Sequence, residues 1–400
     1  MIVVCESQCW GFEHVVFNAA FLESITIACP GEMIEFLGEK SHVQQTREQF
    51  SLIGDPSRIM WVEIDIPERF LSDSQRLVAE FKLFHMLRKR MLIKTVKMLV
   101  VTSITSPGLI ALKTHWALKA DNLPEVLVVL HGVLNYLLLP RTRRPLKRML
   151  GIYNTLTRQN FPKINYIVLG ESIQKRLLQL YPKMKSYVFS INHPYIFSNS
   201  GIAASEFDNF NSLNFGYVGV GAKEKGIELF FRVAKRYASN AVFTVVGRVN
   251  KDVKVPPVIT GYSTETPIER QTYERLIKSL TYVVLPYSPR FYQLVASGAM
   301  LDAVAFAKPI IVLANPYFET YFKLRGDIGF LCQSEEELIT TIEDQIENFD
   351  RSRYDQQVRN ISALKKVFSP QAVAVQLQEI PFIHSITEKL NDRIRLNNHS

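Results

Sequence analysis

A glycine-rich turn holds the residues with the clearest chemical meaning in this 400-residue chain. Gly219, Gly221 and Lys225 lie between an expected strand at residues 215–218 and a helix that is expected to start near residue 226. Glycines let a ligand approach the backbone, and a helix start offers unpaired N–H groups at the positive end of a dipole. Lys225 adds a full positive charge. The pattern therefore predicts a binding site for an anion such as a phosphate group.

A second group of candidates comes from the helix expected at residues 297–307. Ser297 is its expected N-cap, and Gly298 follows. Asp302 stands in an otherwise apolar part of this helix, where aspartate is a poor helix former and costly to bury without a partner. A ligand hydroxyl would be such a partner.

These two segments resemble the nucleotide-sugar domain of GT-B glycosyltransferases, and most of all the bacterial family 4 (group 1) enzymes. The family pattern is Gly-Arg-x-x-x-Glu-Lys-Gly, followed later by Glu, seven residues and Glu-Ala-x-Ala-x-Gly-x-Pro. The matching residues of this chain are Gly219, Glu224, Lys225 and Gly226 in the first motif and Asp302, Ala303, Ala305 and Pro309 in the second. The resemblance implies that Lys225 contacts the donor diphosphate and that Asp302 contacts the ribose hydroxyls.

Three positions depart from the family pattern. Val220 replaces an arginine that contacts the diphosphate, Leu294 replaces the first glutamate, and Ala307 replaces a glycine. That glutamate usually contacts the donor sugar. The missing positive charge is expected either from Arg248, at the end of the next strand, or from Lys223 in the same turn.

Two further residues are candidates for donor binding. Tyr262 follows a short strand expected at residues 258–259, where family members hold the nucleotide base, and it is either a stacking partner of that base or an ordinary surface tyrosine. Arg290 lies in an expected loop, and its planar fork suits phosphate or sugar oxygens. The sequence has no Asp-x-Asp element, and a lysine with a helix dipole can stabilise a leaving diphosphate. We therefore expect no metal and no cofactor, the nucleoside-diphosphate sugar being a substrate.

The candidate catalytic residues lie in the N-terminal half. His131 directly follows the apolar strand expected at residues 126–130, where family 4 enzymes often have a histidine near the donor sugar. Glu13 and His14 lie in the loop after the first strand, and either offers the base that an inverting transferase needs to deprotonate its acceptor. The alternatives are a His131 satisfied by neighbouring backbone and ordinary helix-surface positions for the other two.

Strands and helices are expected to alternate along the chain, which indicates mainly parallel sheets covered on both faces. In the first half, strands are expected at residues 2–5, 33–37, 60–64, 96–102, 126–130 and 166–169, and helices at residues 74–92, 107–119, 146–157 and 172–181. The expected fold is α/β, with two Rossmann-like domains facing each other across a cleft as in the GT-B architecture. Residues 1–205 are the expected acceptor domain, residues 206–375 the nucleotide-sugar domain, and residues 376–400 a helix and tail that cross back to the first domain.

The composition limits the cellular setting. The chain carries a formal charge of +9, and its four cysteines show no disulfide or zinc spacing, which fits a reducing cytoplasm. No signal peptide and no membrane span are expected. Basic and apolar residues are mixed at residues 82–97 and 137–150, so these segments are either docking surfaces for an anionic membrane or ordinary amphipathic helices. Nucleic acid is not an expected partner, because the basic segments lack stacking aromatics and recognition motifs.

These features lead to one main hypothesis and two alternatives. The main one is a cytoplasmic glycosyltransferase, peripheral to the inner face of the cell membrane, that moves a sugar from a nucleoside-diphosphate donor to a lipid-linked or cell-surface polysaccharide acceptor. The family resemblance favours retention of configuration. The alternatives are a GT-B sugar-nucleotide epimerase, which needs no acceptor, and a catalytically inactive GT-B assembly partner, which Val220 and Leu294 motivate.

Overall fold

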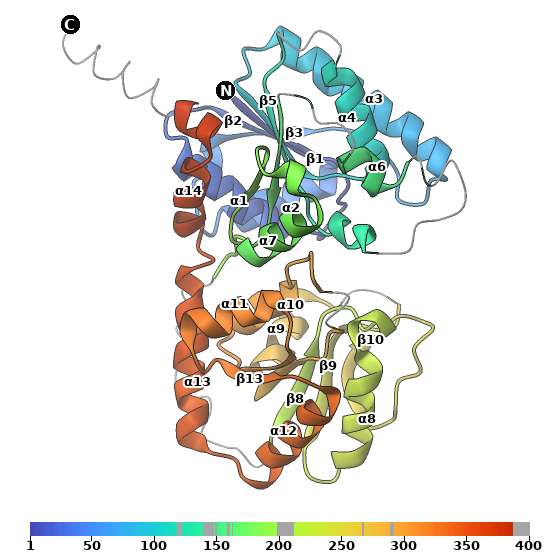
Figure 1. Ribbon diagram of the computed structural model, residues 1–400, viewed down its shortest axis with the longest axis vertical. Helices are drawn as coiled ribbons and strands as arrows, with labels where there is room; N and C mark the ends of the chain where they lie inside the picture. Colours follow the sequence, from blue (N-terminus) through green and yellow to red (C-terminus); the bar gives the residue numbers. More distant parts are fainter. Residues whose placement is uncertain are drawn as a thin grey trace, which may run out of the picture. The chain divides into compact units, whose positions relative to one another are not determined.

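The chain folds into two compact domains, which Figure 1 shows with their helices and strands labelled. The computed structural model describes residues 1–117, 122–138, 148, 150–157, 161, 163–197, 212–265, 268–288 and 292–386. The first domain comprises Met1–Ile196 with Phe368–Ser400, and the second comprises Phe197–Val367. Within the described parts of the chain, every helix falls short of the length or the apolar content that crossing a bilayer requires.

A seven-stranded parallel sheet forms the centre of the first domain, in the order β3-β2-β1-β4-β5-β6-β7. Its strands are β1 (Ile2–Glu6), β2 (Ile34–Gly38), β3 (Ile59–Glu63), β4 (Met98–Ser103), β5 (Glu125–Val129), β6 (Ile164–Val168) and β7 (Val188–Ser190). Strands β1, β2, β4 and β6 are buried along their whole length, as parallel strands covered on both faces are. All the strands expected from the sequence are present, and β7 is an additional one whose apolar run is too short to recognise.

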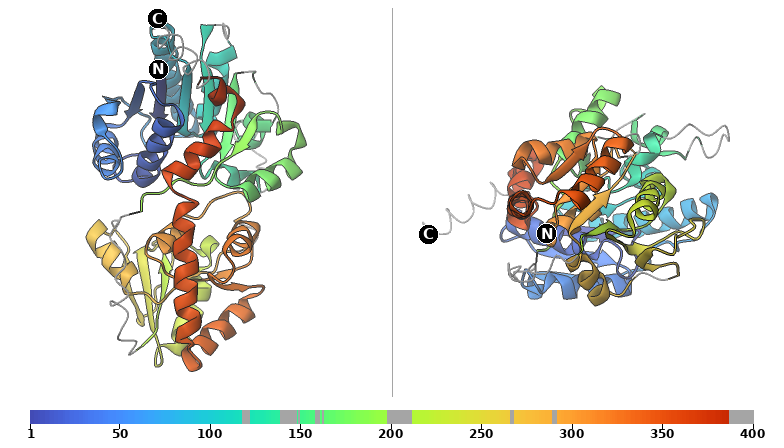
Figure 2. Two further views of the ribbon diagram at one scale, coloured as in Figure 1. Left: turned by 90° about the vertical axis from the view of Figure 1, so that its left-hand side faces the viewer. Right: turned by 90° about the horizontal axis from the view of Figure 1, so that it is seen from below.

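Helices connect these strands, as two further views show (Figure 2). The described helices of this part are α1 (Val15–Ala28), α2 (Lys40–Phe50), α3 (Asp73–Ile93), α4 (Ser106–Ala117), α6 (Ile152–Thr157) and α7 (Glu171–Leu180). The start of α3 is fixed by a capping box, in which Ser72 and Gln75 satisfy each other's backbone N–H groups. Helix α6 begins at Ile152 in the described residues, whereas the sequence predicted a start near residue 146, and residues 139–147 lie outside the described part.

A six-stranded parallel sheet forms the second domain, in the order β10-β9-β8-β11-β12-β13. Its strands are β8 (Asn214–Val218), β9 (Val242–Arg248), β10 (Ile259–Ser263), β11 (Tyr282–Leu285), β12 (Ile310–Leu313) and β13 (Gly329–Cys332). Its helices are α8 (Ile227–Tyr237), α9 (Arg270–Lys278), α10 (Gly298–Ala305), α11 (Pro316–Arg325), α12 (Glu335–Glu347) and α13 (Arg351–Ala363). The prediction of two Rossmann-like α/β domains is confirmed.

The prediction that Tyr262 follows a strand is wrong. Tyr262 lies inside β10. The ladder with β9 pairs Tyr262 with Gly247 and Ser263 with Arg248, after a register shift. Pairing with a neighbouring strand thus extends β10 beyond the apolar run that the sequence displays.

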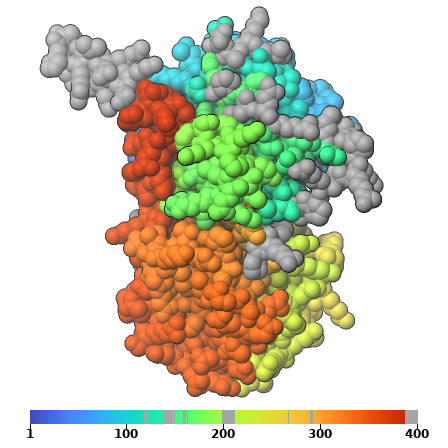
Figure 3. Space-filling view, viewed as in Figure 1, coloured from blue at the N-terminus to red at the C-terminus, as the bar shows by residue number. Residues whose placement is uncertain are grey.

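The C-terminal helix α14 (Pro370–Gln378) belongs to the first domain and packs along α1 (Figure 1). The side chain of Gln376 accepts from the Asn192 N–H at 2.7 Å, and Gln378 donates to the Ala28 carbonyl at 3.2 Å. The space-filling view shows the red atoms of this segment on the surface of the first domain (Figure 3). The domains divide at residues 196/197 and 367/368, whereas the expected boundary at 205/206 falls outside the described residues.

Candidate functional site

The loop of residues 7–14, at the carboxyl end of β1, is held by the fully buried carboxylate of Glu6. Its Oε1 accepts from the backbone N–H groups of Gln8 and Cys9 at 3.0 and 3.2 Å. The Ser7 hydroxyl adds a bond of 2.7 Å to the carbonyl of Ser103 on the neighbouring strand β4. The end of one buried strand therefore fixes the backbone of the loop that follows it.

Side chains complete the shell around Glu6. Its Oε2 accepts from Asn18 Nδ2 at 3.1 Å and from Thr102 Oγ1 at 2.9 Å, and the Ser103 hydroxyl donates to Oε1. Burial opposes ionisation, but nearby histidines and these hydrogen bonds outweigh it and lower the pKa of Glu6. The group is thus an ionised carboxylate with a donor for each of its lone-pair sites.

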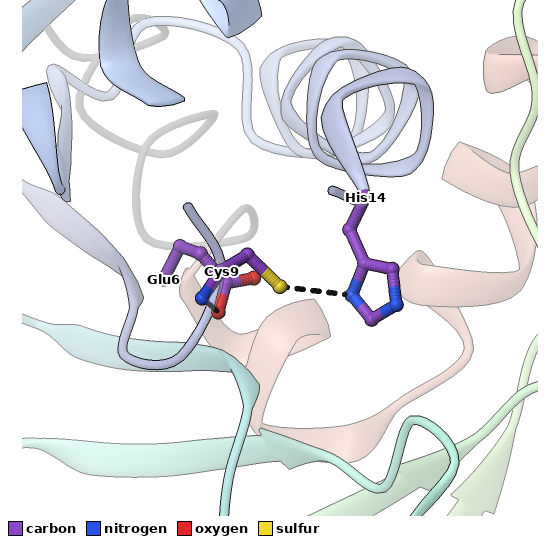
Figure 4. A group of neighbouring side chains, drawn as sticks. All are labelled: Glu6, Cys9 and His14. Atoms are coloured by element: carbon purple, nitrogen blue, oxygen red, sulfur yellow. Dashed lines mark hydrogen bonds between the residues drawn. The ribbon is translucent and has the colours of Figure 1, made fainter. Parts of the chain in front are cut away.

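Cys9 and His14 face each other across this loop (Figure 4). Sγ of Cys9 lies 3.2 Å from Nδ1 of His14, and the His14 ring stacks on the His131 ring with centroids 4.0 Å apart and an interplanar angle of 6°. His14 has a left-handed backbone with φ 55°, which costs a non-glycine residue on the order of 1 kcal/mol. The structure therefore brings together two of the three predicted catalytic residues.

His131 follows β5 as predicted and lies in a cluster of rings. It makes edge contacts with Phe17 and His193 at centroid distances of 4.7 and 5.3 Å. Its Nδ1 is buried and has no hydrogen-bond partner in the described residues, so the expected alternative of a backbone-satisfied His131 does not hold for this nitrogen. Burial, with smaller effects from His14 and His193, sets the pKa of His131 well below its ordinary value, so its ring is neutral at pH 7.

Glu13 is the third predicted catalytic residue, and it is engaged elsewhere. Its carboxylate pairs with Arg69 at 3.0 Å, and both side chains are exposed. Arg69 also donates to the carbonyl of Trp10 at 3.3 Å. A carboxylate that is held in an ion pair must leave its partner before it can approach an acceptor hydroxyl, so this arrangement does not favour Glu13 as the group that removes an acceptor proton.

Glu6, Cys9 and His14 also have the spacing of metal ligands, with one ligand atom of each within 4.8 Å of the others. One observation argues against a metal centre. The Glu6 oxygens are already used by protein donors. The residues present fit a hydrogen-bonded network better than a metal.

In the second domain, the predicted glycine-rich turn is tightly built. Gly219 and Gly226 have φ values of 101° and 73°, and a Cβ on Gly226 would lie 1.9 Å from the carbonyl oxygen of Pro286. The N–H groups of Lys225 and Gly226 donate to carbonyls within the turn. The expected free N–H groups are therefore fewer here than the sequence predicted, since a short 3-10 helix, Lys223–Lys225, consumes them.

Lys225 is half-buried beside this turn. Burial lowers the pKa of its ammonium group. Within the described residues, the ammonium group has no hydrogen bond or ion pair. A positive charge without a protein partner can bind an anionic ligand without first breaking an existing bond.

The start of α10 lies next to the turn, because a Cβ on Gly219 would be 3.9 Å from the Cβ of Ala299. Ser297 is the N-cap, as predicted, and its hydroxyl accepts from the Met300 N–H at 3.2 Å. Gly298 is exposed, and among the described residues a side chain there would meet nothing within 4 Å. The first N–H groups of α10 thus have room for an anion beside Gly219.

Asp302, on the same helix, has a partner that the sequence analysis missed. Tyr273, from α9, donates its hydroxyl to Oδ2 of Asp302 at 2.7 Å. A protein hydroxyl therefore supplies the bond that was expected from a ligand, although a carboxylate can accept several more. Tyr273 is far from Asp302 in the sequence, and no local sequence pattern predicts that the two residues pair.

The remaining candidates for donor binding differ in their exposure and in their neighbours. Arg248 is exposed at the end of β9, on the strand next to Tyr262, which is 39% exposed in β10. Lys223, the other candidate for the missing charge, lies 3.7 Å from Asp252. Leu294 is buried in place of the family's glutamate. Arg290 lies outside the described residues.

A hollow of about 590 Å³ opens beside the turn, and the turn, the start of α8 and the carboxyl ends of β11, β12 and β13 line it. In sheets of this kind, ligands bind where the strand order reverses, which is between β8 and β11. Its lining includes Lys223, Gly226 and Ser288 but not Lys225 or Asp302. The hollow therefore adjoins the predicted donor contacts without containing them.

Comparisons with known proteins concern the fold. No family model and no curated protein sequence matches the chain. Among solved structures, WaaG, a glycosyltransferase involved in lipopolysaccharide biosynthesis, matches with a TM-score of 0.64 and 11% identity over 95% of this chain and 99% of its own. HepE of Anabaena, in complex with UDP-glucose, matches with a TM-score of 0.62 and 12% sequence identity, over 98% of this chain and 99% of its own. Sucrose-phosphate synthase of Thermosynechococcus elongatus matches with a TM-score of 0.62 and 13% sequence identity, over 95% of this chain and 98% of its own. The chain thus has the fold of GT-B glycosyltransferases.

Proposed function

We propose that the protein is a glycosyltransferase that moves a sugar from a nucleoside-diphosphate donor to a lipid-linked or cell-surface polysaccharide acceptor. The observation that carries the proposal is the placement of the α10 start against the Gly219 turn, which also holds Lys225, an ammonium group with no partner in the described part of the chain. Free N–H groups, a helix dipole and a cation together stabilise a departing diphosphate. Neighbours of the same fold include one with bound UDP-glucose and one involved in lipopolysaccharide biosynthesis, which fits these substrate classes.

The roles follow from chemistry and position. Lys225 and the first N–H groups of α10 hold the diphosphate, and the carboxylate of Asp302, which also accepts from Tyr273, contacts a ribose hydroxyl. Arg248 supplies the second positive charge, because Lys223 already has an acidic neighbour. Tyr262, on the strand beside Arg248, stacks on the nucleotide base.

We propose retention of configuration at the transferred sugar. An inverting enzyme needs a general base for the acceptor hydroxyl, and a retaining one does not. Glu13 is held by Arg69, and Nδ1 of His14 faces the Cys9 thiol. His131, neutral and with a buried unpaired nitrogen, serves as a contact to the donor sugar.

We also propose peripheral attachment to the inner face of the cell membrane through helix α3. Lys82 and Lys89 are exposed, and Leu92 and Ile93 at its end are 48% and 85% exposed. Three other basic residues of the 82–97 segment have structural partners instead: Arg90 and Lys94 pair with Glu35, and Lys97 pairs with Glu32. Fewer basic residues are therefore available to bind anionic lipid than the sequence alone indicates. Most of the second basic segment lies outside the described residues.

A catalytically inactive GT-B protein is the alternative, and the burial of Leu294 at 1% exposure favours it. Calorimetry with UDP- and GDP-sugars distinguishes the two proposals at the first step. Saturable binding supports donor chemistry, and its absence for both nucleotides supports the inactive partner. Product analysis with and without a lipid acceptor then separates a transferase, which needs the acceptor, from an epimerase, which does not.

A further inference from the structure

The exposed side chains of helix α3 form one continuous stripe along the helix. In an α-helix with 3.6 residues per turn, positions 78, 82, 85, 89, 92 and 93 lie within about 100° of one another around the axis. All six side chains of this α3 stripe are exposed: Val78, Lys82, His85, Lys89, Leu92 and Ile93. Figure 1 shows α3 on the outer side of the first domain, where it packs against α4. The stripe is thus a free face of the helix.

The α3 stripe is apolar at both ends and basic between them. Val78 is 57% exposed at one end, and Ile93 is 85% exposed at the other. Lys82 and Lys89 lie between these two residues, and neither has an ion pair within the described residues. Both lysines are therefore available to a negatively charged partner.

Negative charge is absent from the α3 stripe. Helix α3 has two acidic residues: Glu80 is fully buried on the opposite side of the helix, and Asp73 belongs to the first turn, before the stripe begins. A surface that combines apolar groups with unpaired lysines is complementary to a layer of anionic lipid headgroups. The apolar side chains enter the interface, and the lysines reach the phosphates with their ammonium groups.

The two ends of α3 lie at opposite edges of the seven-stranded sheet. A helix that joins parallel strands leads from the carboxyl end of one strand to the amino end of the next, here from β3 to β4. Arg69, shortly before α3, pairs with Glu13 at 3.0 Å and donates to the carbonyl of Trp10 at 3.3 Å. The start of α3 is therefore next to the loop of residues 7–14. Its end is about 30 Å away, the length of a 21-residue helix.

We propose that α3 lies flat on an anionic membrane, with the whole stripe from Val78 to Ile93 in the interface. This inference rests on the membrane attachment proposed above and adds its orientation. Attachment through Leu92 and Ile93 alone would stand the helix on its end and hold the loop of residues 7–14 about 30 Å from the bilayer. A flat helix keeps both of its ends at the same depth, so that loop lies beside the headgroups, where a lipid-linked acceptor carries its sugar.

The orientation is tested by the depth of labelled positions in the full chain. The four native cysteines are buried, so a single added cysteine takes up an environment-sensitive fluorophore selectively. The labelled positions are Val78→Cys, Ile93→Cys and the control Val375→Cys. Val375 lies on α14 of the same domain and is 58% exposed, which matches the exposure of Val78. Each protein is mixed with vesicles of phosphatidylcholine and phosphatidylglycerol, with and without a nitroxide-labelled lipid.

We expect a rise in fluorescence, and quenching by the nitroxide lipid, of similar size at positions 78 and 93 and of neither kind at position 375. A response at position 93 without one at position 78 would show end-on attachment. That result would overturn the inference and leave the proposed attachment intact. A response at none of the positions, or an equal response at position 375, would overturn both.

The lysines of the stripe are tested by the double variant Lys82→Gln/Lys89→Gln in vesicle sedimentation. Each lysine near an anionic surface strengthens binding about fivefold, so the double variant should bind roughly 25-fold more weakly than the wild type. The control is Lys183→Gln/Lys185→Gln, which changes two exposed lysines of the same domain and should bind like the wild type. Thermal unfolding of both variants verifies that they are folded.

An unchanged affinity of Lys82→Gln/Lys89→Gln would overturn the inference, because the stripe would then not face anionic lipid. An acidic protein would be the remaining occupant. A failure of the protein to bind sugar nucleotides would instead contradict the proposed transferase alone. The two results are independent, since the vesicle experiments contain no sugar nucleotide.

Discussion

Two fully buried glutamates of the first domain have pKa values that are shifted in opposite directions. Nearby His14 and His42, together with hydrogen-bond donors to both oxygens, outweigh burial and lower the pKa of Glu6. Glu80, on α3, accepts from Thr105 at 2.9 Å, but its Oε2 has no partner within the described residues. Burial raises the pKa of Glu80 to about 7, with Thr105 and Arg76 opposing the rise. The positively charged neighbours and the hydrogen-bond donors together decide which form each group keeps.

Glu6 should stabilise the fold only while it is ionised. Its folded-state pKa is below the unfolded one, so its contribution is complete above the unfolded value of about 4.3 and declines as the pH falls through the folded value. We expect Glu6→Gln to lower the free energy of unfolding by about 2–4 kcal/mol at pH 7. Urea unfolding at pH 7 measures this loss, and a cost below about 0.5 kcal/mol would contradict the role of the carboxylate.

Glu80 should behave in the opposite way. Its folded-state pKa is above the unfolded one, so its contribution is complete below the unfolded value and is lost as the pH rises through about 7. The isosteric Glu80→Gln should therefore gain stability over the wild type between pH 5 and pH 8, by on the order of 3 kcal/mol. Urea unfolding of both proteins across this range tests the sign. A stability difference that does not change with pH argues against the raised pKa.

Removal of the positive charge of Lys225 should weaken the binding of the donor. Loss of a charge-assisted bond to a diphosphate costs about 1.5–3 kcal/mol, or roughly 10- to 150-fold in the dissociation constant. Calorimetric titration of Lys225→Ala with the nucleotide sugar that binds the wild type measures the change. Lys235→Ala on the exposed side of α8 is the matched control and should leave the affinity unaltered. Equal affinities of Lys225→Ala and the wild type would move the donor site elsewhere.

At the scale of elements, the site of the second domain depends on the close approach of two backbones. The turn after β8 touches the backbone at Pro286, and the start of α10 lies against Gly219. Any side chain at Gly226 would separate these segments, whereas Gly298 faces open space. Glycine is therefore required at one position for packing and is only permissive at the other.

The two glycines make a paired test of this geometry. Gly226→Ala should destabilise the second domain by more than about 2 kcal/mol, because the new Cβ meets a carbonyl oxygen and φ is positive. Gly298→Ala should be neutral or stabilise by up to about 1 kcal/mol, since it enters a helix with free space around it. Thermal unfolding of both variants provides the measurement. Similar effects of the two substitutions would mean that the turn can relax.

At the scale of the whole molecule, the chain carries a formal charge of +9. Part of the basic sequence on α3 and after it neutralises Glu32 and Glu35 and so supports the fold. The surface that we propose for the membrane contact is the exposed end of α3, where Leu92 and Ile93 lie beside lysines. The proposed membrane attachment combines apolar insertion with attraction to anionic lipid.

Vesicle flotation of the full chain tests this surface. We expect binding to vesicles with anionic lipid that falls with added salt, and a several-fold loss of bound protein in Ile93→Glu. Leu324→Glu, an exposed leucine of the second domain, is the control and should bind like the wild type. Retention of full binding by Ile93→Glu would exclude the end of α3 as the contact.

The sequence by itself determined the alternation of strands and helices, because buried parallel strands and amphipathic helices have local apolar patterns. It also located the Gly219–Lys225 turn and the Ser297 cap, whose residue types are dictated by neighbouring backbone. Only the tertiary structure decided which of these groups meet. The pairs Asp302–Tyr273 and Glu6–Ser103, and the stacking of His14 on His131, join residues from different elements. Such contacts depend on how elements pack, and no local pattern encodes them.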